Sequence, residues 1–317
     1  MVHDEREQPP PETPDEIAKL GKYKFSSDAN PRDVFWAIVK AYVEKEHFAE
    51  TVKANEDKRV ALVNVSSTAL TEEPRVPRVK ITKGKMAECI LAMVLEGEWK
   101  DVLERVFDNL YNRKKGPNLN MLVALGNAYS KEPKRVGEWM KELLLSGRPP
   151  EATLAYVSQL GDEKLVKELR DQLLNISKTE INEPQLYALE ALSILVGKDK
   201  EVEKLFLDMM DDWDARAKKV VLEHLTGRED PDVGKKALSI YPYEFDPYAK
   251  SVLREIVDRN REGLKEEVVK LLNRLGEREA KELVNLVLSV YSGEEAMEMS
   301  RELVSERTRS ELLTHVK

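Results

Sequence analysis

The sequence has little of what identifies secreted or membrane proteins. It contains one cysteine, Cys89, so no disulfide can form within the chain, which fits a reducing compartment. No apolar run reaches the roughly 18 residues of a membrane-spanning helix. The first residues, MVHDEREQPPPETPDE, lack the basic and then apolar pattern of a signal peptide. We therefore expect a cytoplasmic protein without membrane segments.

Common catalytic and cofactor-binding motifs are also missing. The chain has no HExxH, no GxSxG, no P-loop and no cluster of cysteine and histidine. Its four histidines lie far apart, at His3, His47, His224 and His315. The sequence therefore predicts no metal and no cofactor. An enzyme whose site no motif reveals stays an alternative, because fold alone does not exclude it.

Charged residues, in contrast, are abundant. They make up 35% of the 317 residues, and the formal net charge is -8. An acidic chain is not a default binder of polyanions, because its long-range field repels phosphate. The high content of Glu, Lys and Arg, with few Gln, favours a thermophilic source.

From about Pro117 to Trp213 the pattern predicts helix after helix, broken by Gly, Pro or Asp, and the rhythm continues towards the C-terminus. Four glycines follow apolar residues, or one polar spacer, at intervals of 35, 36 and 30 residues: Gly126, Gly161, Gly197 and Gly227. A glycine in the left-handed conformation commonly ends a helix. We expect antiparallel helix pairs, with an inner helix that is apolar over a wide arc and an outer, more charged one.

This period resembles that of the TPR and HEAT classes of α-solenoid. Leu125-Gly126 with Tyr129, and Pro149-Pro150 after them, are similar to part of one TPR unit. The resemblance implies an all-α fold, a right-handed helical-hairpin repeat. It is also physically reasonable, because a two-helix unit with apolar residues on both sides of one helix needs neighbours to cover the second side.

Three regions are expected. Residues 1–21 form a disordered, Pro-rich acidic tail, residues 22–81 an N-terminal helix and an irregular basic segment, and residues 82–317 the helical repeat. The helix opens at Asn30-Pro31 and is predicted to continue into the mid-fifties. Residues 59–82 include a β-rich run and two prolines three positions apart, so a short β-hairpin and an extended loop are both open.

Basic residues concentrate in one stretch that contains no acid. The candidate anion-binding residues are Arg75, Arg78, Lys80, Lys83 and Lys85, joined by Arg113, Lys114 and Lys115 if the fold brings them together. They could contact the phosphates of RNA or DNA, or an acidic partner. The alternative is a solvated loop with charges that protect a strand edge. Aromatic residues that could stack on bases are missing nearby.

Two further stretches are candidates for binding a partner. Asp208, Asp211 and Asp212 share one helix face near a helix C-terminus, where negative charge is unfavourable. A cation, a basic partner, or simple capping by Asp212 or Asp214 would each account for them. Tyr241, Tyr243 and Phe245 lie in a proline-bounded turn, either as an exposed docking point or packed between repeats. The four tryptophans are expected in the core: Trp36, Trp99, Trp139 and Trp213.

The function that these features favour is non-catalytic: a scaffold or adaptor that binds a protein or peptide on the repeat surface. A nucleic-acid-associated protein is the first alternative, and an enzyme is the second. The sequence does not define the oligomeric state.

Overall fold

The structure is a computed structural model that describes residues 23–71, 79–145 and 150–314. Within these ranges it is predominantly helical. Its one sheet is the two-residue antiparallel ladder of β1 (Tyr111–Asn112) and β2 (Gly116–Pro117). The prediction of an all-α fold is therefore confirmed. The chain folds into two compact units, unit 1 with residues 1–176 and unit 2 with residues 177–317.

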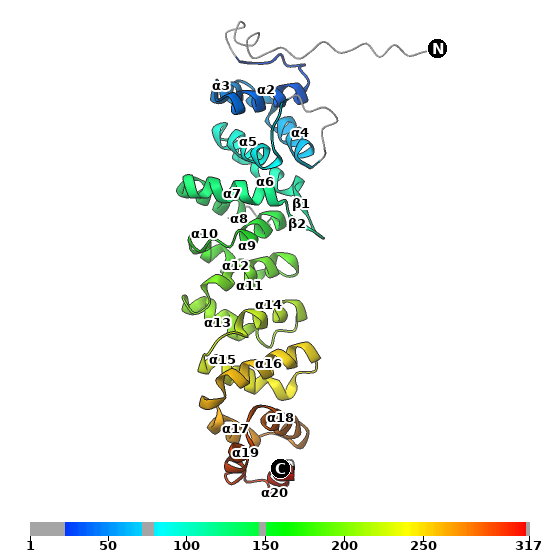
Figure 1. Ribbon diagram of the computed structural model, residues 1–317, viewed down its shortest axis with the longest axis vertical. Helices are drawn as coiled ribbons and strands as arrows, with labels where there is room; N and C mark the ends of the chain where they lie inside the picture. The colour runs from blue at the N-terminus through cyan, green and yellow to red at the C-terminus, as the bar shows by residue number, and fades with distance from the viewer. Residues whose placement is uncertain (1–22, 72–78, 146–149, 315–317) are drawn as a thin grey trace, which may run out of the picture. The chain divides into compact units, whose positions relative to one another are not determined.

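Unit 1 contains two rows of helices (Figure 1). In one row α2, α4, α6 and α9 contact one another in succession, and in the other α3, α5 and α7 do. The helices of this unit are α2 (Pro31–Glu44), α3 (Phe48–Ala54), α4 (Arg59–Thr71), α5 (Lys83–Glu96), α6 (Lys100–Asn109), α7 (Leu119–Lys131), α8 (Pro133–Leu145), α9 (Glu151–Leu160), α10 (Glu163–Glu168) and α11 (Arg170–Thr179), which ends in unit 2, with the 3-10 turn η1 (Glu56–Lys58).

Unit 2 repeats this arrangement. Helices α12, α14, α16, α18 and α20 contact one another in succession, and α15, α17 and α19 form a second row. The elements are α12 (Glu183–Leu192), η2 (Ser193–Leu195), α13 (Lys200–Met209), α14 (Ala215–Leu225), α15 (Pro231–Ile240), η3 (Tyr241–Tyr243), α16 (Pro247–Asn260), η4 (Arg261–Gly263), α17 (Lys265–Leu272), α18 (Glu277–Val290), α19 (Gly293–Ser300) and α20 (Glu306–Thr314).

The core of unit 1 explains why α5 is apolar nearly all round. Helix α5 contacts α4 and α6 on one side and α7 on the other, so residues on both sides of it are buried, among them Ile90, Leu91 and Val94. Helix α6 contacts α4 and α9 of its own row and α5 of the other row. Its buried residues form one apolar stripe, which includes Val102, Val106 and Phe107. Burial of such stripes is the main stabilising contribution in helix packing.

The expectation of irregular or β structure from residue 59 is wrong for residues 59–71, which form α4. The buried residues Leu62, Val63, Ser66, Ser67 and Leu70 have helical spacing, and packing against α2 and α6 overrides the strand preference of the valines. The hydroxyls of Ser66 and Ser67 donate to the carbonyl of Val63 within the helix. The two prolines, with Arg75 and Arg78, lie outside the described residues.

The helix that begins at Asn30 is shorter than predicted. It ends at Glu44, because Lys45 and His47 both adopt the left-handed conformation, with φ of 59° and 53°. Its predicted start is confirmed: Asn30 caps the helix by accepting a hydrogen bond from the Arg32 amide, and Pro31 follows. The chain reverses at residues 45–47 and continues as α3.

The predicted role of the glycines is correct in part. Gly161 and Gly197 have positive φ, of 59° and 78°, at the ends of α9 and η2. Gly126, however, lies inside α7, and a Cβ there would lie 3.1 Å from Cδ1 of Leu160 on α9. Close approach of α7 and α9, not helix termination, therefore accounts for this glycine. The expected tail, residues 1–21, lies outside the described ranges, and the boundaries at residues 21 and 81 stay predictions.

Candidate functional site

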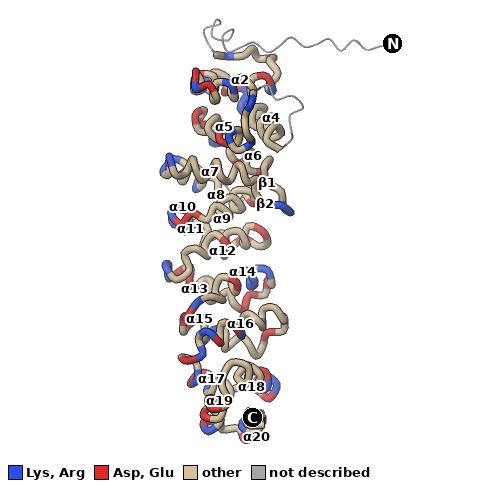
Figure 2. Tube along the Cα trace, in the orientation of Figure 1, with Lys and Arg blue, Asp and Glu red and all other residues tan. Residues whose placement is uncertain are grey.

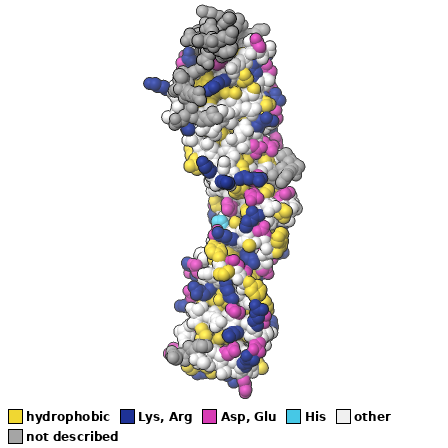
Figure 3. Space-filling view, turned by 90° about the vertical axis from the view of Figure 1, so that its right-hand side faces the viewer, with side chains coloured by type: hydrophobic (Ala, Val, Ile, Leu, Met, Phe, Trp, Pro, Cys, Tyr) yellow, Lys and Arg dark blue, Asp and Glu magenta, His cyan; other side chains and the backbone are white. Residues whose placement is uncertain are grey.

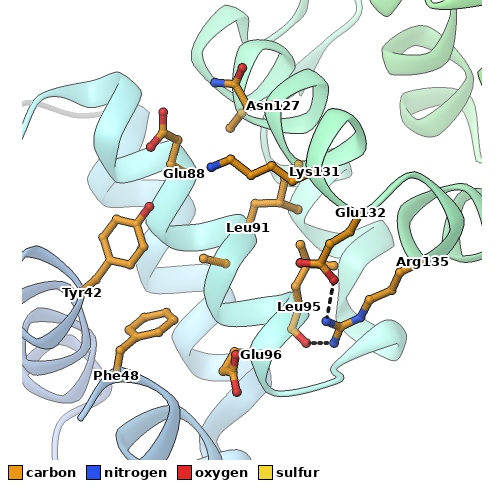
Figure 4. Close-up of a pocket in the computed structure, with 13 residues that line it drawn as sticks. Tyr42, Phe48, Glu88, Leu91, Leu95, Glu96, Asn127, Lys131, Glu132 and Arg135 are labelled. Carbon is orange, nitrogen blue, oxygen red and sulfur yellow. Dashed lines mark hydrogen bonds and ion pairs between the residues drawn. The ribbon is translucent and has the colours of Figure 1, made fainter. Parts of the chain in front are cut away.

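A groove with a volume of about 260 Å³ opens on the surface of unit 1 between α5 and α7 (Figure 4). Its apolar floor consists of Leu91, Ala92 and Leu95 of α5 with Ala124 and Ala128 of α7. The end of α2 and the start of α3 close one end with two aromatic rings, and charged side chains border the rest. We call this concave surface the groove.

Local sequence explains the shape of the groove. Ala124 and Ala128 lie one helical turn apart on the side of α7 that faces α5, so two small side chains leave space there. The first turns of α5 and α7 lie close together, since a Cβ on Gly84 would lie 3.7 Å from the Asn120 side chain. The chain reversal before α3 brings the Phe48 ring edge-on to Tyr42, with centroids 5.2 Å apart.

Ion pairs surround the groove. Lys85 is 2.7 Å from Glu88, and Lys53 is 3.1 Å from Glu96. Arg135 is 3.1 Å from Glu132 and also donates to the backbone carbonyl of Leu95.

Two polar side chains of α7 have no such partner. Asn127 and Lys131 line the groove but make no hydrogen bond or ion pair among the described residues. Figure 4 shows the Lys131 ammonium directed across the groove, above Leu91 and towards Glu88.

Electrostatics favour the charged forms of these pairs. The hydrogen bond from Lys85 holds the pKa of Glu88 below its ordinary value, with Lys131 adding an attractive charge, and the same hydrogen bond raises the pKa of Lys85. Burial raises the pKa of the Tyr42 hydroxyl against the opposing charge of Lys85, whose ammonium lies 5.1 Å from the ring centroid. At neutral pH we therefore expect Glu88 and Lys85 to be ionised and the Tyr42 hydroxyl to be protonated.

The one thiol, Cys89, lies in the core beneath the groove, and its burial raises the thiol pKa, whereas a nucleophilic cysteine needs a lowered one. Among residues 23–71, 79–145 and 150–314 no cluster of His, Cys, Asp and Glu has the geometry to hold a metal ion. An apolar floor with a few polar groups at its border is the general composition of a ligand-binding pocket.

Unit 2 presents a second candidate surface, which we call the aromatic turn, residues 241–248. Tyr241 is buried, whereas Tyr243 and Phe245 are 55% and 75% exposed. Tyr241 is therefore packed in the protein interior, as the packing alternative predicts, whereas Tyr243 and Phe245 are exposed, as the docking alternative requires. Arg278 of α18 lies over the Phe245 ring at 5.3 Å, and Tyr248 donates a hydrogen bond of 2.7 Å to Glu223. Partner binding by the aromatic turn stays a prediction.

The acidic stretch of residues 208–214 is mostly accounted for by local contacts. Asp214 caps α14, and Asp212 accepts a hydrogen bond from the Asp214 amide, as the capping alternative predicts. Asp211 pairs with Lys236 at 3.1 Å, and Asp208 is exposed. The prediction that all four tryptophans lie in the core is wrong for Trp213. It is 85% exposed, because it belongs to the turn before α14.

The basic residues fall into two groups in unit 1. Lys83 and Lys85 belong to the first turn of α5, just after Lys80, and Arg113, Lys114 and Lys115 lie in the β1–β2 hairpin before α7. Figure 2 shows the hairpin tip as a basic projection, and in Figure 3 a row of Lys and Arg side chains gathers at its level. Arg113 pairs with Glu151 at 2.8 Å. Anion binding by this set stays a prediction.

The sequence did not indicate the residues of the groove. Tyr42, Phe48, Asn127 and Lys131 come from three helices, and only packing brings them together. One signal was present: alanines at positions 124 and 128 on the apolar side of a helix otherwise rich in larger residues. Such small residues mark either close helix approach or a hollow, and the pattern alone does not distinguish them.

The geometry defines an all-α protein with a surface groove between two neighbouring helices of one row. No protein-family model matches the chain, and no curated protein matches it. Within the part of the chain that the structure describes, none of the helices combines the length and apolar character needed to span a membrane.

Proposed function

We propose that this chain is a helical-repeat scaffold of the α-solenoid kind, similar to TPR and HEAT proteins, that binds a segment of a partner protein in the groove. Two features support the repeat assignment. In each unit, every helix of a row contacts the next helix of the same row. A helix with apolar residues on two sides, such as α5, needs a neighbouring helix on each of these sides.

The groove is the observation that carries the binding proposal. Its volume of about 260 Å³ is below the roughly 300–1,000 Å³ of pockets for drug-sized ligands, so it fits one or two side chains of a longer segment. The Tyr42 and Phe48 rings supply the rigid aromatic area that is common at protein interfaces. Most charged side chains at the border are already paired, so the apolar floor is the surface that is left to contact a partner side chain.

A peptide-display selection against the intact chain tests the proposal. We expect enriched peptides with an apolar anchor residue, and we expect their affinity to fall at least about tenfold in Ala92→Arg, which fills the groove while keeping good helix propensity. The measurement is fluorescence anisotropy with labelled synthetic peptides.

Ser130→Arg is the matched control, because it adds the same side chain to an exposed position of α7 outside the groove. Its affinity should stay within about twofold of the parent. Selection without enrichment, or peptides that bind Ala92→Arg as well as the parent, would show that the groove is not a binding site.

A further inference from the structure

The charges around the groove do not balance. The charged residues that line the groove are three carboxylates, Glu88, Glu96 and Glu132, and two cations, Lys131 and Arg135. Lys53 and Lys85 lie beside the lining and pair with Glu96 and Glu88. Once these pairs and the Arg135–Glu132 pair are counted, one cation of the lining, Lys131, is left over, in a chain whose net charge is -8. A local excess of positive charge in an acidic protein points to an anionic ligand group.

The excess belongs to one residue. Each carboxylate has its own cation within 3.1 Å, at Lys53, Lys85 or Arg135, and Lys131 alone has none in the described ranges. Lys131 is exposed, and its stem crosses above Leu91 so that the ammonium lies at the border of the groove (Figure 4). Asn127, one turn earlier on α7, adds an amide that can donate a hydrogen bond.

We propose that the groove selects a partner segment with an acidic side chain, Asp or Glu, next to an apolar anchor. This rests on the proposed function. The anchor enters the hollow bounded by Phe48, Leu91 and Leu95. The carboxylate of the neighbouring acidic residue contacts the Lys131 ammonium and accepts from the Asn127 amide. The anchor and the acidic residue lie within about four residues of each other in the partner sequence. Four residues span roughly 6 Å in a helix and roughly 13 Å in a strand.

The surroundings of Lys131 favour a singly charged side chain over a phosphate or a chain terminus. Glu88 lies close enough to respond to the charge of Lys131, so a dianionic phosphate would meet repulsion from it. The lining residues of α7 and the start of α8 run from Ala124 past Lys131 to Arg135, so residues of the groove lie on both sides of Lys131 along the chain. We therefore expect the bound segment to extend on both sides of the charged contact, as an internal residue requires and a C-terminal residue does not.

The test uses the full chain and a random-peptide library displayed with both peptide ends fused to carrier. We expect Asp or Glu to be enriched within about four positions of the apolar anchor, and Lys131→Glu to reverse this preference to Lys or Arg. For a selected synthetic peptide, Lys131→Gln should weaken binding about two- to fivefold, as expected for an exposed ion pair. The same loss should follow when the acid is replaced by its amide, and it should shrink at high salt.

Two variants serve as comparisons. Lys134→Gln removes an equal charge from an exposed position that does not line the groove, and it should leave affinity unchanged. Glu88→Gln should strengthen binding, because it removes a nearby negative charge that would repel an acidic side chain.

The outcomes separate the two proposals. Peptides that lose affinity in Ala92→Arg but show no acidic preference and no response to Lys131→Gln would overturn this inference and leave the proposed function standing. A requirement for a free C-terminal carboxylate, or a preference for phosphopeptides, would also overturn it. Peptides that ignore Ala92→Arg would overturn both.

Discussion

Glu244 lies at the centre of the aromatic turn, with 8% of its side chain exposed, and its Oε2 is 2.8 Å from Nζ of Lys218. Its other oxygen accepts hydrogen bonds of 2.8 Å from the amides of Phe245 and Asp246. Burial alone would raise the pKa of this carboxyl. The hydrogen bonds from Lys218 and the two amides outweigh burial and hold the pKa below its ordinary value of 4.5.

We therefore expect Glu244→Gln to lower the unfolding free energy at pH 7 by about 1–3 kcal/mol, because it leaves Lys218 largely buried without its partner. Since the folded-state pKa is lowered, this stabilisation is present above about pH 4.5 and is lost as the pH falls through the folded-state value. Urea unfolding of both proteins at pH 7 and at acidic pH measures the difference.

Glu255→Gln is the control for this residue, because Glu255 belongs to an exposed pair with Arg259 on α16. It should change the unfolding free energy by less than about 0.5 kcal/mol. A Glu244→Gln deficit that stayed constant down to low pH would show that the charge of Glu244 is not its cause.

Single residues were the least predictable level. The exposure of Trp213 could not be read from sequence, because an aromatic next to apolar helices usually packs between them, and only the start of α14 at Ala215 leaves it in a turn. The unpaired state of Lys131 depends on where three other lysines and arginines find their partners. Caps were more predictable, since Asn30 and Asp214 act on residues close by in sequence.

At the scale of elements, the end of α9 depends on Gly161. Its φ of +59° is costly for any residue with a Cβ, although no atom lies within 4 Å of the Cβ position. We expect Gly161→Ala to lower the unfolding free energy by about 1–2 kcal/mol through backbone strain alone. The measurement is the shift of the urea midpoint at constant slope.

Gly263→Ala is the matched substitution, because Gly263 also has open space around its Cβ position but no positive φ. It should be neutral or slightly stabilising. If Gly161→Ala and Gly263→Ala lowered the unfolding free energy equally, the positive φ of Gly161 would not be the cause of the loss.

Elements were predicted well where one apolar stripe repeats, as in α6 and α18. The prediction failed for α4, because Val60, Val63 and Val65 carry a local strand preference that only the neighbouring helices α2 and α6 override. It failed for Gly126 because a glycine inside a helix and one at its end look alike in sequence. Gly126 is needed because α9 packs closely against α7 at this position. Helix α9 begins only at Glu151, so a local reading of the sequence around Gly126 does not reveal the contact.

At the scale of the whole molecule, the charge distribution leads to a prediction about polyanions. With a net charge of -8, and with Lys85 and Arg113 already paired to carboxylates, we expect little retention on heparin. Elution should be complete by about 0.15 M salt, where screening removes weak contacts.

The opposite result has a definite form. Retention beyond about 0.3 M salt that disappears on charge reversal at Arg75, Arg78 and Lys80 would favour the nucleic-acid alternative over the scaffold. As a control, Lys164 and Lys167 on α10, outside the basic stretch in sequence, are reversed and should leave retention unchanged.

The solitary buried thiol of Cys89 has a practical consequence. Because the chain has no other cysteine, a cysteine introduced at Trp213 or Ser130 would be the sole position open to a maleimide dye or nitroxide. Spectroscopic reporters can thus be attached next to the groove in unit 1 or at the exposed turn before α14 in unit 2, one at a time or as a pair, without first removing a native sulfhydryl.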